Sequence, residues 1–186
     1  MKSYLKVLPI LIIVLLSLIS TAYATSYAPP KAKKIYSLDN HYFIDFNPDK
    51  KTQQVMKVIN NTDATYAWSF SYDIEYGDEL FVSNNGMHVL IVRSKFVITE
   101  DLHKPAVLIF NSNGLQTKFT YSQLSTPRKY HDREIGPIGE SWRVWRENKI
   151  LISTDGLLHI KTENHSRDIL FNLNSTDRKN NLLKKS

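Results

Sequence analysis

The residues best suited to binding chemistry are gathered between Thr126 and Arg146. The first half of this segment is polar and titratable, and the second half places two tryptophans next to arginines. Loops on a rigid β scaffold often carry function, and an exposed tryptophan beside an arginine is typical of binding hot spots. A strand would send one tryptophan into the core and leave the other near the surface beside an arginine. A loop that only packs its own tryptophan as a lid is the alternative. The predicted partner-binding residues are Arg128, His131, Arg133, Trp142, Arg143, Trp145 and Arg146.

The densest acidic cluster consists of Asp73, Glu75, Asp78 and Glu79. On a strand, Asp73 and Glu75 would share one face, and a turn at Gly77 would fold Asp78 back toward them. Calcium takes several carboxylate oxygens, so this cluster is a weak candidate for a metal site. A solvated outer strand face that ends in a turn is the preferred interpretation. Two carboxyl groups at a suitable separation would also serve a glycosidase, although nothing in the sequence selects a pair.

Each catalytic template tested against the chain is incomplete. The run Gly139-Glu140-Ser141-Trp142-Arg143 begins like a nucleophile elbow but lacks the closing glycine. The chain has no HExxH helix motif, no P-loop and no GxGxxG, and its six histidines have no ligand spacing. The absence of cysteine excludes thiol catalysis, cysteine-bound zinc and iron–sulfur clusters. The sequence therefore predicts no catalytic residue, metal or cofactor.

The positive charge of the chain is not typical of a nucleic-acid binder. The 186 residues carry a formal net charge of +6, but the excess lies in two polar ends, residues 25–34 and 177–186. Residues 35–176 contain 15 basic and 17 acidic residues, which is a net charge of −2. A nucleic-acid binder carries its positive charge on a folded face, so nucleic acid is not the predicted partner.

The N-terminus has the layout of a secretory signal peptide. Lys2 and Lys6 precede a nearly apolar stretch, Val7–Ile19, and Ala22-Tyr23-Ala24 supplies small residues for cleavage after Ala24. We expect a mature chain in the periplasm or outside the cell, without a membrane span. The alternative is a retained anchor, since Val7–Ala24 is close to the minimum spanning length.

The mature chain is expected to form one all-β domain, residues 35–175, between a flexible linker (25–34) and a disordered basic tail (176–186). The clearest strand is Tyr66–Tyr76, in which every even position is a large apolar or aromatic residue and the odd positions are small or polar. We expect the even side chains to face the core. Further strands are expected at 41–46, 54–59, 89–92, 106–110, 117–121, 142–145, 150–152, 157–161 and 169–173.

Turn chemistry lies between these runs. The pairs Asn85-Gly86, Asn113-Gly114 and Asp155-Gly156 predict hairpins with type I′ turns. One turn of helix is expected around Tyr121–Leu124, and no longer stretch has a helical apolar stripe.

Three segments repeat one plan, in which a serine is followed by a polar turn and then a strand. They begin at Ser37, Ser83 and Ser153, at spacings of 46 and 70 residues. Such a unit is similar to one blade of a β-propeller. With the run from Ile135 to Trp145 as a landmark, residues 35–175 resemble uncharacterised exported bacterial proteins with blade-like repeats. This resemblance implies an antiparallel meander of short strands, partly propeller-like, and no particular activity. A β-sandwich or a curved open sheet is the alternative.

The leading functional hypothesis is an exported, non-enzymatic β-domain that binds a protein or an envelope glycan. An inhibitor or immunity protein would belong to this class. A hydrolase that uses Asp or Glu and a structural component of the envelope are the alternatives.

Overall fold

The computed structural model describes residues 30–124, 128–129, 142–153, 156–162 and 169–173, and within them the protein is all-β, as predicted. The one α-helix in these ranges is the single turn α2 (Tyr121–Leu124), at its predicted position. None of the helices in these ranges has the length and apolar character needed to cross a membrane. The predicted signal peptide lies outside the described residues.

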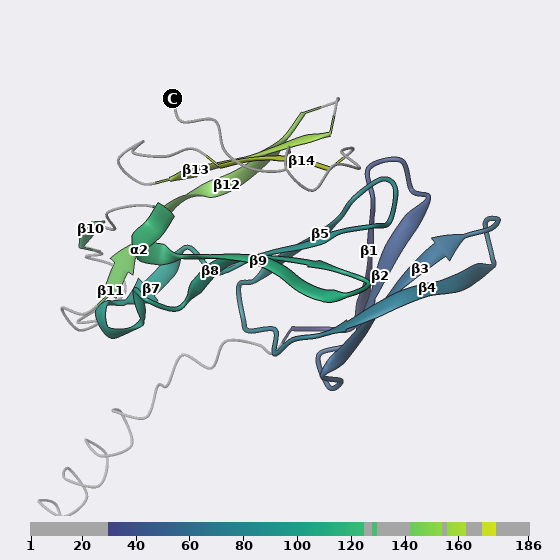
Figure 1. Ribbon diagram of the computed structural model, residues 1–186, viewed down its shortest axis with the longest axis horizontal. Coiled ribbons are helices and arrows are strands. Elements are labelled where there is room, and N and C mark those ends of the chain that lie inside the picture. Colours follow the sequence, from purple (N-terminus) through teal and green to yellow (C-terminus); the bar gives the residue numbers. More distant parts are fainter. Residues whose placement is uncertain (1–29, 125–127, 130–141, 154–155, 163–168, 174–186) are drawn as a thin grey trace, which may run out of the picture.

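The strands form three antiparallel meanders and one small sheet (Figure 1). Sheet 1 contains β1 (Lys33–Tyr36), β2 (Tyr42–Phe46), β3 (Thr52–Val58) and β4 (Ala64–Ser71). Sheet 2 contains β5 (Glu79–Val82), β6 (Val89–Val92), β8 (Pro105–Asn111) and β9 (Gly114–Thr120). Sheet 3 contains β12 (Arg146–Ile152), β13 (Leu157–Thr162) and β14 (Ile169–Asn172). The small sheet contains β7 (Phe96–Ile98), β10 (Arg128–Lys129) and β11 (Trp142–Val144).

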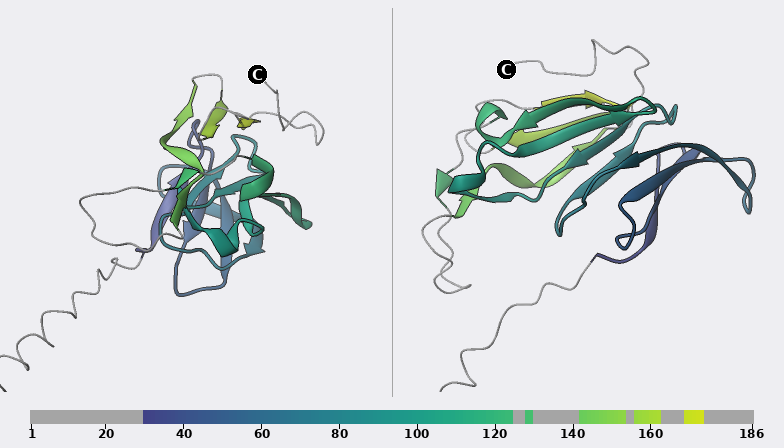
Figure 2. Two further views of the ribbon diagram at one scale, coloured as in Figure 1. Left: turned by 90° about the vertical axis from the view of Figure 1, so that its left-hand side faces the viewer. Right: turned by 60° about the horizontal axis from the view of Figure 1, so that its bottom comes forward.

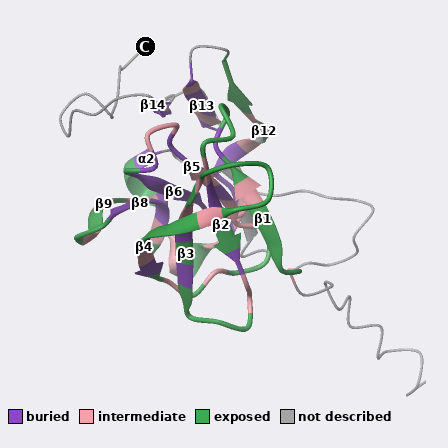
Figure 3. Ribbon diagram, turned by 90° about the vertical axis from the view of Figure 1, so that its right-hand side faces the viewer, coloured by how far each residue is buried: buried purple, intermediate pink, exposed green. Residues whose placement is uncertain are grey.

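Sheet 2 lies between sheets 1 and 3, and both of its faces are covered (Figure 2). All four residues of β6 are buried, as the purple ribbon shows (Figure 3). Val89 and Ile91 pack into the core shared with sheet 1, while Leu90 and Val92 pack into the core shared with sheet 3. A strand with both faces covered needs no polar alternation, which explains the unbroken apolar run.

The three serine turns predicted from the repeat have the same hydrogen bonds. In the turn between β5 and β6, the Ser83 backbone N–H donates to the carbonyl of His88, and the Ser83 hydroxyl oxygen accepts from the His88 N–H. Ser37 makes the same pair of bonds with Tyr42, and Ser153 makes it with Leu157. Each of the three meanders therefore begins with a hairpin closed by its own serine.

These turns differ in detail from the predicted two-residue hairpins. The β5–β6 connection occupies residues 83–88, so the serine bridge closes a longer loop around Gly86, whose φ is +66°. In the β8–β9 hairpin, Asn111 pairs with Gly114, and the two loop residues are Ser112 and Asn113. The turn is thus one residue earlier than the Asn113-Gly114 pair predicted.

The alternation predicted for Tyr66–Tyr76 is only partly correct. Trp68 and Phe70 are buried in the core between sheets 1 and 2, but Tyr66 is 58% exposed and Tyr76 is 54% exposed. Strand β4 ends at Ser71, so Tyr76 lies beyond it.

A β-bulge explains why Tyr66 leaves the core. Trp68 lies opposite Val55 on β3, and Tyr66 lies opposite Met56, so Ala67 is an extra residue on β4. An extra residue shifts the alternation by one position and turns every side chain beyond it to the other face. Tyr66 therefore shares a face with Met56, on the side of sheet 1 away from the core.

Candidate functional site

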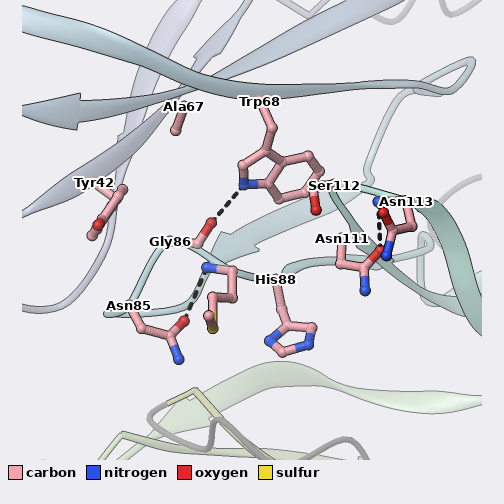
Figure 4. Close-up of a pocket in the computed structure, with 10 residues that line it drawn as sticks. Tyr42, Ala67, Trp68, Asn85, Gly86, His88, Asn111, Ser112 and Asn113 are labelled. Atoms are coloured by element: carbon pink, nitrogen blue, oxygen red, sulfur yellow. Dashed lines mark hydrogen bonds between the residues drawn. The ribbon is translucent and has the colours of Figure 1, made fainter.

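A pocket of about 330 Å³ lies where the ends of sheets 1 and 2 meet (Figure 4). Its lining comes from β2, β4, the serine turn before β6, the last residue of β8 and the turn before β9. The lining residues are Tyr42, Ala67, Trp68, Asn85, Gly86, Met87, His88, Asn111, Ser112 and Asn113.

One hydrogen bond fixes the aromatic wall of the pocket. The indole Nε1 of Trp68 donates to the carbonyl oxygen of Gly86 at 2.6 Å, which joins β4 to the serine turn of the neighbouring sheet. The ring of Tyr42 packs so closely against Gly86 that any side chain on this residue would collide with it. Two features therefore require glycine at this position: the closeness of the Tyr42 ring and the positive φ of the backbone.

Amide side chains from two turns supply the polar wall. Asn85 accepts a hydrogen bond from the Met87 N–H at 2.9 Å through its Oδ1, and Asn111 accepts one from the Asn113 N–H at 2.8 Å in the same way. Those bonds position the two turns. Ser112 and Asn113 are exposed at the rim. The Ser112 hydroxyl and the Asn113 amide at the rim offer both donors and acceptors, so this edge of the pocket suits a ligand with hydroxyl groups.

The wall carries no formal charge of its own. Among the described residues that line the pocket there is no Asp, Glu, Lys or Arg. A glycosidase of the usual kind needs two carboxyl groups beside the bond that it cleaves. The pocket wall offers aromatic contact and neutral hydrogen bonding.

Two residues of the predicted partner-binding segment are core residues. Trp145 is fully buried, and its Nε1 donates to the Ser94 carbonyl at 2.6 Å. Arg146 is 3% exposed, and its guanidinium binds the Glu79 carboxylate at 2.8 Å and the carbonyl of Arg93 at 3.3 Å. The prediction that these two side chains meet a partner is wrong, since neither reaches the surface. Their role is to attach sheet 3 and the small sheet to sheet 2.

For three of the other predicted partner-binding residues, the structure gives the strand pairing only. Arg128 pairs with Val144 in the ladder between β10 and β11, while Trp142 pairs with Ile98 and Arg143 with Val97 between β11 and β7. His131 and Arg133 lie outside the described residues. A single tryptophan in the core was expected from the strand pattern, and Trp145 fills that position.

The acidic cluster forms ion pairs with arginines. Arg93 binds Asp78 at 2.7 Å and Glu75 at 3.2 Å, and Glu79 binds Arg146. Asp73 and Glu75 lie beyond the end of β4 at Ser71, and both are exposed, while Tyr72 before them and Ile74 between them pack against the core. The expected turn at Gly77 is present, with φ of +83°.

Asp78 is the most perturbed acid of this cluster. Its side chain is fully buried, and its Oδ1 has no hydrogen-bond partner within the described part of the chain. Burial raises the pKa of Asp78 to about 6, against the opposing effect of the Arg93 guanidinium. No group of three His, Cys, Asp or Glu side chains suited to a metal ion is found among the residues described.

The pocket residues were not predicted as a site. The sequence marked Trp68 as core and Asn85 and Asn113 as turn residues, and each of these positions is consistent with its local pattern. The repeated serine turns could have indicated that polar turns gather at one end of stacked sheets. Which of them would face an aromatic wall depends on how the sheets pack.

Comparison of the sequence with known families and curated proteins gives no match: no protein-family model matches the chain, and no curated protein matches its sequence.

Proposed function

We propose that this protein is an exported, non-enzymatic binding module for an envelope glycan, and that the pocket between sheets 1 and 2 holds a short uncharged stretch of it. The observation that carries the proposal is the composition of the pocket wall, which combines aromatic rings with amide side chains and has no charged group. The N-terminal signal pattern supports export.

The chemistry of a sugar matches this wall. A pyranose presents hydroxyl groups around its rim and an apolar C–H face, so it needs hydrogen-bonding groups and a ring surface together. The Ser112 hydroxyl and the Asn113 amide offer the first, and the half-buried Tyr42 ring, with the edge of the largely buried Trp68 behind it, offers the second. The volume of about 330 Å³ is at the small end of ligand pockets, which suits one or two sugar units.

Titration with short uncharged oligosaccharides tests the proposal. Chitotriose, cellotriose and maltotriose would be added to the protein while tryptophan fluorescence and the side-chain amide NMR signals of Asn85 and Asn113 are followed. We expect at least one sugar to shift these signals in a saturable way. If none of the three sugars shifts them at millimolar concentration, the proposed function is wrong.

A variant that fills the pocket provides the control for location. Ala67 is exposed and lines the pocket, so Ala67→Phe should block the sugar without removing a core contact. Ser71→Phe places the same ring on an exposed position farther along β4 and should leave the titration unchanged. Equal binding by both variants would place the sugar elsewhere on the protein.

A further inference from the structure

The outer face of sheet 1 carries a single row of apolar side chains that crosses all four strands. Tyr36 pairs with Phe43, Phe43 with Met56, and Met56 with Tyr66. Residues directly opposite each other in antiparallel strands point to the same face. The neighbouring row, Ile44 with Val55, is buried in the core, so this row faces outward. We call these four residues the aromatic row.

The two ends of the aromatic row are exposed rings. Tyr36 is 49% exposed and Tyr66 is 58% exposed, whereas Phe43 between them is 4% exposed. The Tyr36 ring covers Phe43 at a centroid distance of 5.2 Å, and the Lys34 ammonium lies 4.8 Å from the Phe43 ring centre. With strands about 4.8 Å apart, four strands give the row a length of about 14 Å.

The bulge at Ala67 is what completes the row. Without this extra residue Tyr66 would point into the core side with Trp68, and β4 would contribute a small or polar side chain to the outer face. The cost of the bulge is one unpaired position in the ladder between β3 and β4. The bulge therefore turns the Tyr66 ring toward solvent, where it extends the aromatic row onto β4.

A polar row runs beside the aromatic row on the same face. Lys34 pairs with Asp45, Asp45 with Gln54, and Gln54 with Ser69. Its two charged members have opposite sign, so the row is neutral as a whole. The hydroxyl of Tyr66 donates to Ser69 Oγ at 3.3 Å, which links the two rows.

We infer that the outer face of sheet 1 is a second binding surface, for a linear uncharged polysaccharide that lies along the aromatic row. This inference goes beyond the pocket and rests on the proposed function only for the class of ligand. A strip one residue wide, with an exposed tyrosine ring at each end and a polar row of zero net charge beside it, matches a chain whose sugar rings expose C–H faces and whose edges expose hydroxyls. Balanced charge disfavours an anionic polymer, and a strip so narrow is unlike the broad apolar face of a stable dimer.

Polysaccharide binding by ring-deletion variants tests this surface. The protein, expressed from the full chain, would be mixed with insoluble chitin, insoluble cellulose and purified peptidoglycan sacculi, and the bound fraction measured against polymer concentration. We expect wild type to bind at least one polymer and Tyr36→Ala/Tyr66→Ala to bind it roughly 10- to 100-fold more weakly, since two stacked rings are lost. Tyr36→Phe/Tyr66→Phe keeps both rings and should retain most of the binding.

Matched controls separate binding from folding. Tyr76→Ala removes a tyrosine of similar exposure outside sheet 1 and should bind like wild type. Thermal unfolding should remain cooperative in the double alanine variant, with a lower midpoint than in wild type because the loss of Tyr36 uncovers Phe43. Binding is therefore compared at a temperature at which both proteins are folded. Equal polymer binding by wild type and the double alanine variant would overturn the inference, as would wild type that binds none of the polymers.

The two experiments distinguish an error in the proposed second surface from an error in the proposed pocket. The double alanine variant should keep its response to the trisaccharides, and Ala67→Phe should keep most of its polymer binding. Trisaccharide binding without an effect of the ring deletions would leave the pocket and remove the second surface. A wild-type dimer that the ring deletions dissociate, with no polymer bound, would assign the face to a second copy of the chain and overturn the inference.

Discussion

The indole of Trp68 and the backbone of Gly86 are joined by a 2.6 Å hydrogen bond that connects two sheets. Trp68 belongs to β4, and Gly86 belongs to the serine turn that opens the next meander, 18 residues later. The same bond closes one wall of the pocket. Stability and site geometry therefore depend on a common contact.

Substitutions at Trp68 should separate burial from hydrogen bonding. Trp68→Ala empties a buried aromatic position and should lower the free energy of unfolding by about 3–5 kcal/mol, and Phe70→Ala should cost a similar amount. Trp68→Phe keeps an aromatic ring but leaves the Gly86 carbonyl unpaired, at a cost of about 1–3 kcal/mol. Denaturant titration measures all three. A loss below about 1 kcal/mol for both alanine variants would mean that this face is not core.

Gly86→Ala should be strongly destabilising for two reasons. The new Cβ would collide with the Tyr42 ring, and the φ of +66° is unfavourable for any residue with a side chain. Gly114→Ala is the matched control, because Gly114 also has a positive φ but has open space where its Cβ would lie. We expect Gly114→Ala to cost about 1–2 kcal/mol and Gly86→Ala to cost clearly more. Equal losses in thermal or denaturant unfolding would contradict the packing against Tyr42.

Trp145→Ala and Arg146→Ala should act on stability. Trp145 is fully buried and meets Tyr121 edge to face at 5.5 Å, so its removal should cost about 3–5 kcal/mol. Arg146→Ala leaves the Arg93 carbonyl without its guanidinium partner and should cost about 1–3 kcal/mol. The measurement is the free energy of unfolding together with the trisaccharide titration. Variants that are as stable as wild type but no longer bind sugar would contradict the core role of these two residues.

Stability should decrease with rising pH through the titration of Asp78. Burial raises the pKa of this carboxyl from 3.8 to about 6, so between these values the folded protein holds a proton that the unfolded chain has released. The stabilising contribution is complete below about pH 3.8 and is lost as the pH rises through about 6, with a slope of at most about 1.4 kcal/mol per pH unit.

Asp78→Asn should remove this component of the pH dependence. Asp73→Asn, at an exposed acid nearby, is the control and should retain it. Urea unfolding at several pH values between 4 and 7 makes the comparison. A wild-type curve with the same pH dependence as Asp78→Asn would contradict the raised pKa.

Local chemistry made much of the fold predictable. The serine turns close through hydrogen bonds between residues four or five positions apart, so the same short pattern gives the same turn three times. The apolar run at 89–92 is sufficient to predict a strand, and the turn of helix at Tyr121–Leu124 also lies where expected. Several strand ends coincide with the prediction and most others lie within four residues of it, as at β12, which begins at Arg146 instead of Ile150. The largest difference is at β4, which ends at Ser71, five residues before Tyr76.

The candidate sites depended on long-range packing. Alternation along Tyr66–Tyr76 distinguishes two faces of a strand, but it does not reveal a bulge, because Ala67 becomes the extra residue only against β3. Trp145 had the composition of a binding residue, yet the carbonyl that holds it belongs to Ser94, 51 residues away.

The sequence by itself determined the β class, the repeated turns and the apolar central strand, since each follows from hydrogen bonds and periodicity within a few residues. Only the tertiary structure decided which tryptophan is core, which tyrosines reach solvent and which turns meet around the pocket. The physical reason is that burial is a property of two packed surfaces, and a side chain's own segment supplies just one of them.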